Sequence, residues 1–158
     1  TYGILGSAFS HKAVNEIYRL RKSDLNKPFI ILISSMKDLK KFGVFPTADQ
    51  RKILRKLWPG AVSIILPCLQ EKFAYLHRGR KSLAFRMPKN TGLLKLLRET
   101  GPLVAPSANL QGCPVAKNIS EARAYFGHQV DYYKDAGSVI APPSKLIDLT
   151  SGVEKVLR

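Results

Sequence analysis

The chain is poor in residues that bind metals or form disulfides. It has two cysteines, Cys68 and Cys113, without a CxxC spacing, and three scattered histidines, His11, His77 and His128. Zinc sites and disulfide frameworks need clustered or regularly spaced ligands, which this pattern does not supply. We therefore expect two reduced structural thiols and no protein-bound metal site.

Long hydrophobic runs and two common catalytic motifs are also missing. No window approaches the ~18 uninterrupted apolar residues of a membrane span, and the first residues, TYGILGSAFSHK, lack the charged-then-apolar order of a secretion signal. We expect a soluble, cytoplasmic protein. The sequence contains neither GxxxxGK before Ser or Thr nor GxSxG. These absences argue against a P-loop nucleotide site in its usual form and against a covalent serine hydrolase.

Acidic residues are scarce relative to basic ones. The chain has 11 Asp and Glu against 26 Lys and Arg, a formal net charge of +15. Residues 1–100 carry 20 basic and 6 acidic residues, whereas residues 101–158 carry 6 and 5. Such a regional field concentrates polyanions such as nucleotides or RNA and accelerates their encounter. The alternative is a solvated basic surface that only keeps the protein soluble.

Apolar periodicity and capping residues predict five helices. With 158 residues, 45% of them hydrophobic, the chain suits one domain that buries roughly 70% of its unfolded surface. In the helix after Asn90 we expect the leucines of TGLLKLLRET, namely Leu93, Leu94, Leu96 and Leu97, to face inward. The five helices are expected after the caps Ser10, Ser35, Thr47, Asn90 and, near NISEARAYF, a Ser or Asn cap.

Branched and aromatic runs between these helices predict strands. The last two strands are expected to form a hairpin across Ser151 and Gly152. Helices alternate with strands early in the chain and strands cluster late, which predicts an α/β domain with a mixed sheet flanked by helices over residues 1–158. The strands are expected at 29–33, 61–66, 82–87, 102–105, 130–133, 145–150 and 153–158.

Two short polar side chains follow the predicted strand 102–105. In alternating α/β sheets, ligands bind where strands end and loops converge. Ser107 and Asn109 stand at such an end, and their side chains can donate to anionic oxygens without adding bulk. The alternative is an ordinary turn whose serine and asparagine hydrogen-bond their own backbone.

Six stretches in register carry a resemblance to a known family. They are YGILGSAF (2–9), IYRLRKSDLNKPFIILI (17–33), LWPGAVSIIL (57–66), SLAFRMP (82–88), PLVAPSANLQGCP (102–114) and SKLIDLTSGVEKVLR (144–158). In this order they resemble the YrdC-like family, the L-threonylcarbamoyladenylate synthases. The resemblance implies a twisted α/β sheet with a basic concave cavity.

The same resemblance implies a reaction. Threonine, bicarbonate and ATP, with Mg²⁺ accompanying ATP, would give threonylcarbamoyl-AMP and pyrophosphate. In that family the product serves to modify the adenosine beside the anticodon of certain tRNAs, so tRNA-modification proteins are expected partners. In-line attack on phosphorus requires positioning and charge neutralisation more than a covalent group, which suits a basic site.

The family's motifs carry binding roles onto residues of this chain. On the threonine side the resemblance assigns Arg86 of AFRMP, the backbone near Ala105 and the side chain of Ser144. An arginine amid apolar neighbours needs a partner, and a carboxylate suits its fork. On the ATP side the resemblance assigns Arg21, Ser23, Lys27, Ser82, Ser107, Asn109, Val115 and Arg158.

The sequence departs from the family pattern at several positions. The family's K-x-R becomes Arg21-Lys22-Ser23, so a serine replaces an arginine that faces the triphosphate. Loss of a charge-assisted contact costs about 1.5 to 3 kcal/mol, and Lys22, about 100° away on a helix, is the better candidate to compensate. Leu32 stands where many members carry histidine, and Lys145 replaces a small hydroxyl residue. The first motif, P-T-acid-T-x-Y-G-L, is expected to begin upstream of the first residue.

Two other functions remain open at this point. One is a YrdC-like protein that binds double-stranded RNA or tRNA through its basic surface, with catalysis weakened at Ser23. The other, less favoured because such domains sit in far longer chains, is a carbamoyl-transferring domain of a hydrogenase-maturation protein. RNA binding would weaken steeply with salt and be indifferent to ATP, which distinguishes it from the enzyme.

Overall fold

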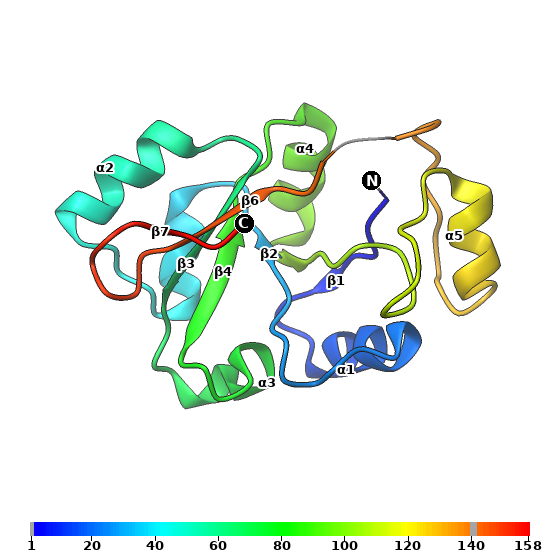
Figure 1. Ribbon diagram of the computed structural model, residues 1–158, viewed down its shortest axis with the longest axis horizontal. Coiled ribbons are helices and arrows are strands. Elements are labelled where there is room, and N and C mark those ends of the chain that lie inside the picture. Colours follow the sequence, from blue (N-terminus) through cyan, green and yellow to red (C-terminus); the bar gives the residue numbers. More distant parts are fainter. Residues whose placement is uncertain (1, 140–141) are drawn as a thin grey trace.

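One mixed sheet organises the chain (Figure 1). The computed structural model describes residues 2–139 and 142–158, and in these residues seven strands have the order β1-β5-β2-β4-β3-β6-β7. The β2–β4 and β3–β6 pairs are parallel and the other pairs are antiparallel, which confirms the predicted mixed sheet. The strands are β1 Gly6–Ser7, β2 Ile31–Leu32, β3 Val62–Pro67, β4 Ser82–Arg86, β5 Leu103–Val104, β6 Lys145–Asp148 and β7 Lys155–Val156.

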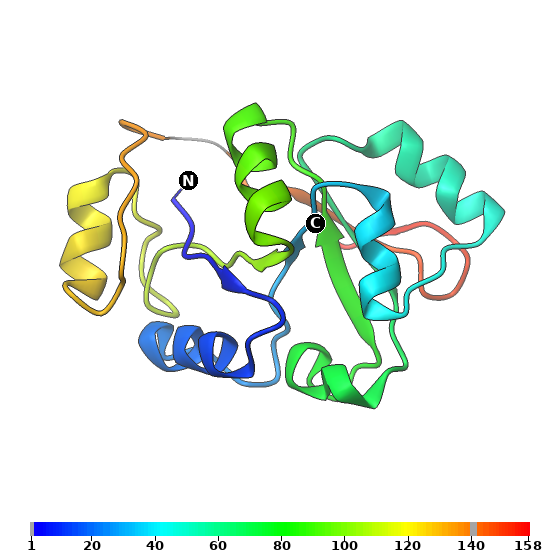
Figure 2. The same cartoon turned by 180° about the vertical axis from the view of Figure 1, so that it is seen from behind.

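The helices flank this sheet (Figures 1 and 2), and α1, α2, α4 and α5 begin at the predicted caps. The side chains of Ser10, Thr47, Asn90 and Asn118 each accept a hydrogen bond from a backbone N–H of the first turn, which satisfies a donor that the helix leaves free. The segment after Ser35 is a 3₁₀ helix. The helical elements are α1 His11–Arg21, η1 Met36–Phe42, α2 Ala48–Leu57, η2 Glu71–Phe73, α3 Ala74–His77, α4 Thr91–Thr100 and α5 Ile119–Phe126.

One face of the sheet is buried across its central strands. Ile31 pairs with both Phe85 and Val104, and Ile64 pairs with Phe85 and Ile147. Paired residues point to the same side of a sheet, and all five of these side chains are at most 3% exposed. This face carries the main core, to which Phe42 of η1 adds its ring 5.2 Å from that of Phe85.

The opposite face is only partly covered. Leu97 of α4 packs there against Leu32 and Leu103. Beyond that contact, Ala84 and Arg86 of β4 and their neighbours Ile30 and Ile65 stay half-buried. The fold therefore offers an accessible strip of sheet that includes the end of β4.

The sequence prediction lacks β1, η2 and α3, and it is wrong in further details. No strand forms over 130–133, where Tyr133 donates to the carbonyl of Gly127 and lies under the guanidinium of Arg123, so side-chain contacts to α5 replace a sheet ladder. Leu96 is 38% exposed rather than inward, because α4 packs on the sheet mainly through Leu97. The strand expected at 29–33 is hydrogen-bonded as a strand only at Ile31–Leu32. None of the described helices is long and apolar enough to cross a membrane.

Candidate active site

A buried arginine joins the end of α1 to the loop after β5. Arg21 is 9% exposed. Its Nε donates to the Ser107 carbonyl at 2.8 Å, and its Nη1 donates to Ser23 Oγ at 2.8 Å. Its Nη2 donates to Ser107 Oγ at 3.3 Å and to Asn109 Oδ1 at 3.1 Å. Four predicted ATP-side residues thus meet in one network.

The loop that carries Ser107 and Asn109 is fixed from both sides. Ser107 Oγ donates to Asn109 Oδ1 at 2.7 Å, and Asn109 Nδ2 donates to the Cys113 carbonyl at 2.7 Å. Gln111 N donates to the Arg21 carbonyl at 2.8 Å. The loop is therefore more than a turn bonded to its own backbone, since α1 holds it through both main chain and side chain.

The other predicted ATP-side residues make no hydrogen bond to this network among the described residues. Lys27 is exposed, and its carbonyl accepts from the Tyr18 hydroxyl at 2.8 Å, which ties its backbone to α1. Ser82 begins β4 on the same face as Arg86, because side chains two residues apart along a strand share a face. Val115 is half-buried and Arg158 is exposed. Their binding roles stay predictions.

The predicted threonine-side residues gather at one end of β3 and β4. Arg86 Nε donates to the Gly60 carbonyl at 3.0 Å, and Ser63 Oγ lies 2.9 Å from Ser144 Oγ. Arg158 Nε donates to the Ser144 carbonyl at 3.2 Å. Since Ile64 pairs with Phe85 in the antiparallel β3–β4 ladder, Arg86 and Ser63 are cross-strand neighbours on the partly covered face.

The sheet register links the two groups of residues. Leu32 pairs with Arg86 on one side and with Leu103 on the other. Ala105 N, two residues beyond Leu103, donates to the Ile30 carbonyl at 2.9 Å. Leu32 is thus the apolar residue directly beside Arg86, at the position where the resemblance expects a histidine.

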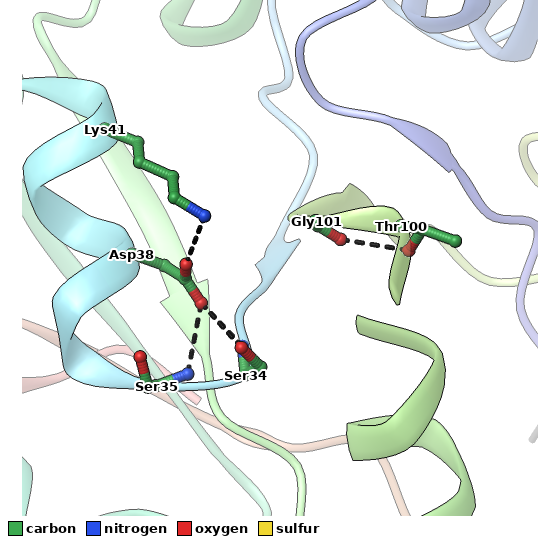
Figure 3. A network of polar contacts seen from close by, with 6 residues as sticks. All are labelled: Ser34, Ser35, Asp38, Lys41, Thr100 and Gly101. Atoms are coloured by element: carbon green, nitrogen blue, oxygen red, sulfur yellow. Dashed lines mark hydrogen bonds and ion pairs between the residues drawn. The ribbon is translucent and has the colours of Figure 1, made fainter. Parts of the chain in front are cut away.

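Asp38 holds the turn that follows β2 (Figure 3). Its Oδ2 accepts from the backbone N–H of Ser34 at 3.0 Å, from Ser34 Oγ at 2.9 Å and from Ser35 N at 3.1 Å, while Lys41 Nζ lies 2.7 Å from Oδ1. Burial alone would raise the pKa of this carboxyl, but the bonds from Lys41, Ser34 and Ser35 outweigh it and lower the pKa below its ordinary value. The ionised carboxylate therefore fixes the turn before η1, which begins four residues beyond Leu32.

Both central arginines are partly buried cations. Burial lowers the pKa of the Arg21 guanidinium and that of the Arg86 guanidinium, because a low-dielectric environment disfavours charge. None of the ion pairs among the described residues involves either side chain, and the hydrogen-bond acceptors of both are neutral oxygens. An arriving anion would therefore find two cations whose charge no carboxylate compensates.

Sequence reasoning missed Ser63 and Gly60. Ser63 is fully buried and is the one polar residue in the apolar run AVSIIL. A buried hydroxyl in such a run needs a hydrogen-bond partner, which is the signal that could have drawn attention to it. Gly60 contributes through its backbone carbonyl, which no side-chain pattern reveals.

The mixed sheet and the two partly buried arginines define an α/β domain suited to an anionic ligand, and comparison with known proteins gives its family. The family model Sua5/YciO/YrdC, described as "Telomere recombination", matches residues 1–158. The chain belongs to this family.

Relatives and solved structures agree with this membership. The chain is 31% identical over 149 residues to the threonylcarbamoyl-AMP synthase of Laribacter hongkongensis, covering 93% of this chain and 78% of that protein. Sua5 of Pyrococcus abyssi, solved as a complex with L-threonine, is similar with a TM-score of 0.88 and 27% identity over 99% of this chain. The chain spans about half of that protein, 46% of its length. E. coli YciO, 23% identical with a TM-score of 0.86, shares the fold.

Proposed function

We propose that the chain makes threonylcarbamoyl-AMP from L-threonine, bicarbonate and ATP and releases pyrophosphate, as a step in tRNA modification with partner proteins. The observation that carries the proposal is the joining of Arg21, Ser23, Ser107 and Asn109 in one network at the loop after β5, a strand that the sheet register connects to Arg86 through Leu32. The names of the Laribacter and Pyrococcus relatives support it.

The proposed reaction proceeds without a covalent enzyme intermediate. The threonine amine combines with bicarbonate to give a carbamate and water. A carbamate oxygen then attacks the α-phosphorus of ATP, and the bond from that phosphorus to the pyrophosphate oxygen breaks. Catalysis of this kind depends on alignment of the two reactants and on neutralisation of phosphate charge.

At the ATP end, Arg21 both positions the loop and supplies charge. A guanidinium has five N–H groups, and four of those of Arg21 are used by Ser107, Ser23 and Asn109. One Nη1 hydrogen remains for a phosphate oxygen, together with the exposed ammonium group of Lys27. The network also holds Ser107 and Asn109 in a fixed arrangement, which lowers the entropy cost of binding.

At the threonine end, Arg86 is the group suited to the substrate carboxylate. Its Nε is held by the Gly60 carbonyl, which leaves the two terminal nitrogens for a bidentate contact. Ser144 is 8% exposed and joined to Ser63, and it would accept or donate beside the bound amino acid. The structure of Pyrococcus Sua5 with L-threonine supports threonine as the ligand class.

Mg²⁺ is proposed to enter with ATP. The described residues contain no group of three or more His, Cys, Asp or Glu side chains that could hold a metal ion. Mg²⁺ commonly keeps several waters and binds through substrate phosphates rather than in an all-protein cage. The basic residues here therefore fit an ion that the triphosphate carries, which would neutralise phosphate charge.

The decisive experiment is pyrophosphate release with each substrate omitted in turn. Release is expected only when ATP, threonine and bicarbonate are all present, with threonylcarbamoyl-AMP detected by mass spectrometry. Release that persists at the same rate without threonine would contradict the proposal. Serine in place of threonine is a useful control for the pocket, because it lacks one methyl group.

RNA binding with weakened catalysis is the second candidate. The net charge of +15 and Ser23 in place of the family's arginine favour it. Affinity for a 16-base-pair RNA duplex that falls steeply with salt and does not change with ATP, in a chain that releases no pyrophosphate, would favour this candidate over the synthase.

A further inference from the structure

An apolar groove with a basic border lies beside η1 and α2. One cavity of about 130 Å³ is lined chiefly by Met36, Leu39, Val44, Pro46 and Leu54, with Lys40 and Arg51 also on its lining. A neighbouring cavity of about 580 Å³ extends from Phe45 and Pro46 to Leu69 and the β6–β7 turn. No residue assigned to ATP or threonine lines either cavity, and in Figure 1 α2 lies at the left of the molecule whereas α1 lies at the lower right.

Large apolar side chains stand exposed around this groove. In the described part of the chain, four large hydrophobic residues are at least 70% exposed: Phe45 at 72%, Leu69 at 70%, Val153 at 71% and Tyr132 at 78%. Phe45 and Leu69 line the larger cavity, and Val153 follows its lining residue Gly152. Clustered exposed apolar residues mark interaction surfaces, whereas single ones are ordinary.

The loop that presents Phe45 is rigidly held. Gly43 caps η1 in the left-handed conformation, with φ of 67°, and Val44 N donates to the Leu39 carbonyl. On the other side, Thr47 and Gln50 form a reciprocal capping box, and Arg51 Nη1 donates to the Pro46 carbonyl at 2.6 Å. A fixed, exposed aromatic side chain contributes contact area at low entropy cost, as do the anchors of protein interfaces.

The charged residues of η1 and α2 indicate which kind of molecule binds the groove. The acidic residues of η1 and α2 are Asp38 and Asp49, and each already pairs with a lysine of its own helix. Five basic residues of these helices form no ion pair within the described chain: Lys37, Lys40, Arg51, Arg55 and Lys56. Lys40 and Arg51 line the smaller pocket, whose other lining residues are apolar, with Phe45 as the one aromatic residue among them. Such a lining suits an apolar side chain.

We propose that this groove docks an acidic segment of a partner protein, with one bulky apolar side chain seated in the pocket beside Phe45 and the flanking carboxylates facing Lys40 and its neighbours. Charge complementarity would accelerate the encounter and the apolar anchor would hold the segment. The surface is separate from the proposed ATP and threonine residues, so the proposal stands independently of the chemistry at those residues.

Synthetic peptides test the proposal. The probe is a fluorescein-labelled peptide of eight Asp and Glu residues around a central Leu-Phe, followed by fluorescence anisotropy. Phe45→Ala and Leu69→Ala are each expected to weaken binding about tenfold or more, as interface anchors do. Tyr132→Ala is the matched control, an equally exposed aromatic residue outside the groove, and should bind like the parent chain.

Charge and partner class are tested with the same assay. Lys40→Glu should weaken binding, and Lys95→Glu on α4 should change it far less. A peptide with Ala-Ala at its centre should lose at least tenfold in affinity. Equal binding by the Phe45→Ala and Tyr132→Ala variants would overturn the proposal, and so would tighter, Phe45-dependent binding of an RNA duplex. Threonine-dependent pyrophosphate release should be unchanged in Phe45→Ala, which separates this result from the proposed function.

Discussion

Arg21 Nη2 lies 3.1 Å from Asn109 Oδ1, although 88 positions separate the two residues in the chain. The bond closes a network in which a buried guanidinium is shared between α1 and the loop after β5. Under the proposed function, this network sets the geometry of the ATP end of the site.

Removal of the Arg21 side chain should therefore act mainly on ATP. Arg21→Ala is expected to raise the ATP concentration needed for half-maximal pyrophosphate release about 10- to 100-fold, since a charge-assisted bond contributes about 1.5 to 3 kcal/mol. The threonine requirement should change far less. Arg19→Ala is the control, because Arg19 lies on the same helix and is solvent-exposed. Similar effects of the two substitutions would rule out the role given to Arg21.

Ser23→Arg tests the departure from the family motif. A second guanidinium at this position would add a cation close to Arg21, and in the presence of ATP the triphosphate would compensate both charges. We expect tighter ATP binding, by about tenfold, from one added charge-assisted contact. Isothermal titration with ATP measures it. Weaker binding than in the parent chain would mean that the Arg21–Ser23 bond matters more than the added charge.

Arg86→Ala should weaken the binding of threonine rather than that of ATP. Loss of the guanidinium is expected to raise the threonine requirement about 10- to 100-fold with little change in the ATP requirement. Arg86→Lys should recover only part of the loss, because an ammonium lacks the planar fork. Steady-state kinetics with each substrate varied separately provide the measurement. Equal effects on both requirements would contradict the assignment.

The lowered pKa of Asp38 predicts that the folded protein loses stability in acid. Its pKa in the folded state lies below the ordinary value of 3.8, so the ionised carboxylate stabilises the fold above that pH, and the stabilisation is lost as pH falls through the lower folded-state pKa. Asp38→Asn should lower the free energy of unfolding by about 1 to 3 kcal/mol at pH 7. Urea titrations should show that the free energies of unfolding of variant and parent differ less at pH 3 than at pH 7. Asp49→Asn, at an exposed pair, is the control.

The helix starts were predictable because their signals are local. Ser10, Thr47, Asn90 and Asn118 cap helices through bonds to residues three positions away, and such spacing is visible in the sequence. The strand expected at 130–133 failed for the opposite reason. Its apolar and aromatic residues suit a strand, but their contacts to Arg123 and Gly127 decide the conformation.

The candidate site likewise has features that local motifs indicate and features that depend on distant residues. Motif resemblance assigned Arg21, Ser107 and Asn109 to the ATP side, but it gave no indication that the Arg21 side chain would be buried. The inward turn of its side chain depends on partners 86 and 88 positions away, which no local pattern encodes. Ser63 was missed because its partner, Ser144, lies 81 positions further along the chain.

The hydrogen-bonded row from Leu103 through Leu32 to Arg86 has a kinetic consequence. If the two reactants bind as proposed, their supports are β4 and the loop after β5, two strands of one sheet that are joined through β2, and neither strand can move without breaking main-chain bonds. The distance between the carbamate oxygen and the phosphorus would then be set by the folded sheet, without a conformational change in each catalytic cycle. Higher solvent viscosity should consequently slow substrate binding and product release but leave the rate of the chemical step unchanged.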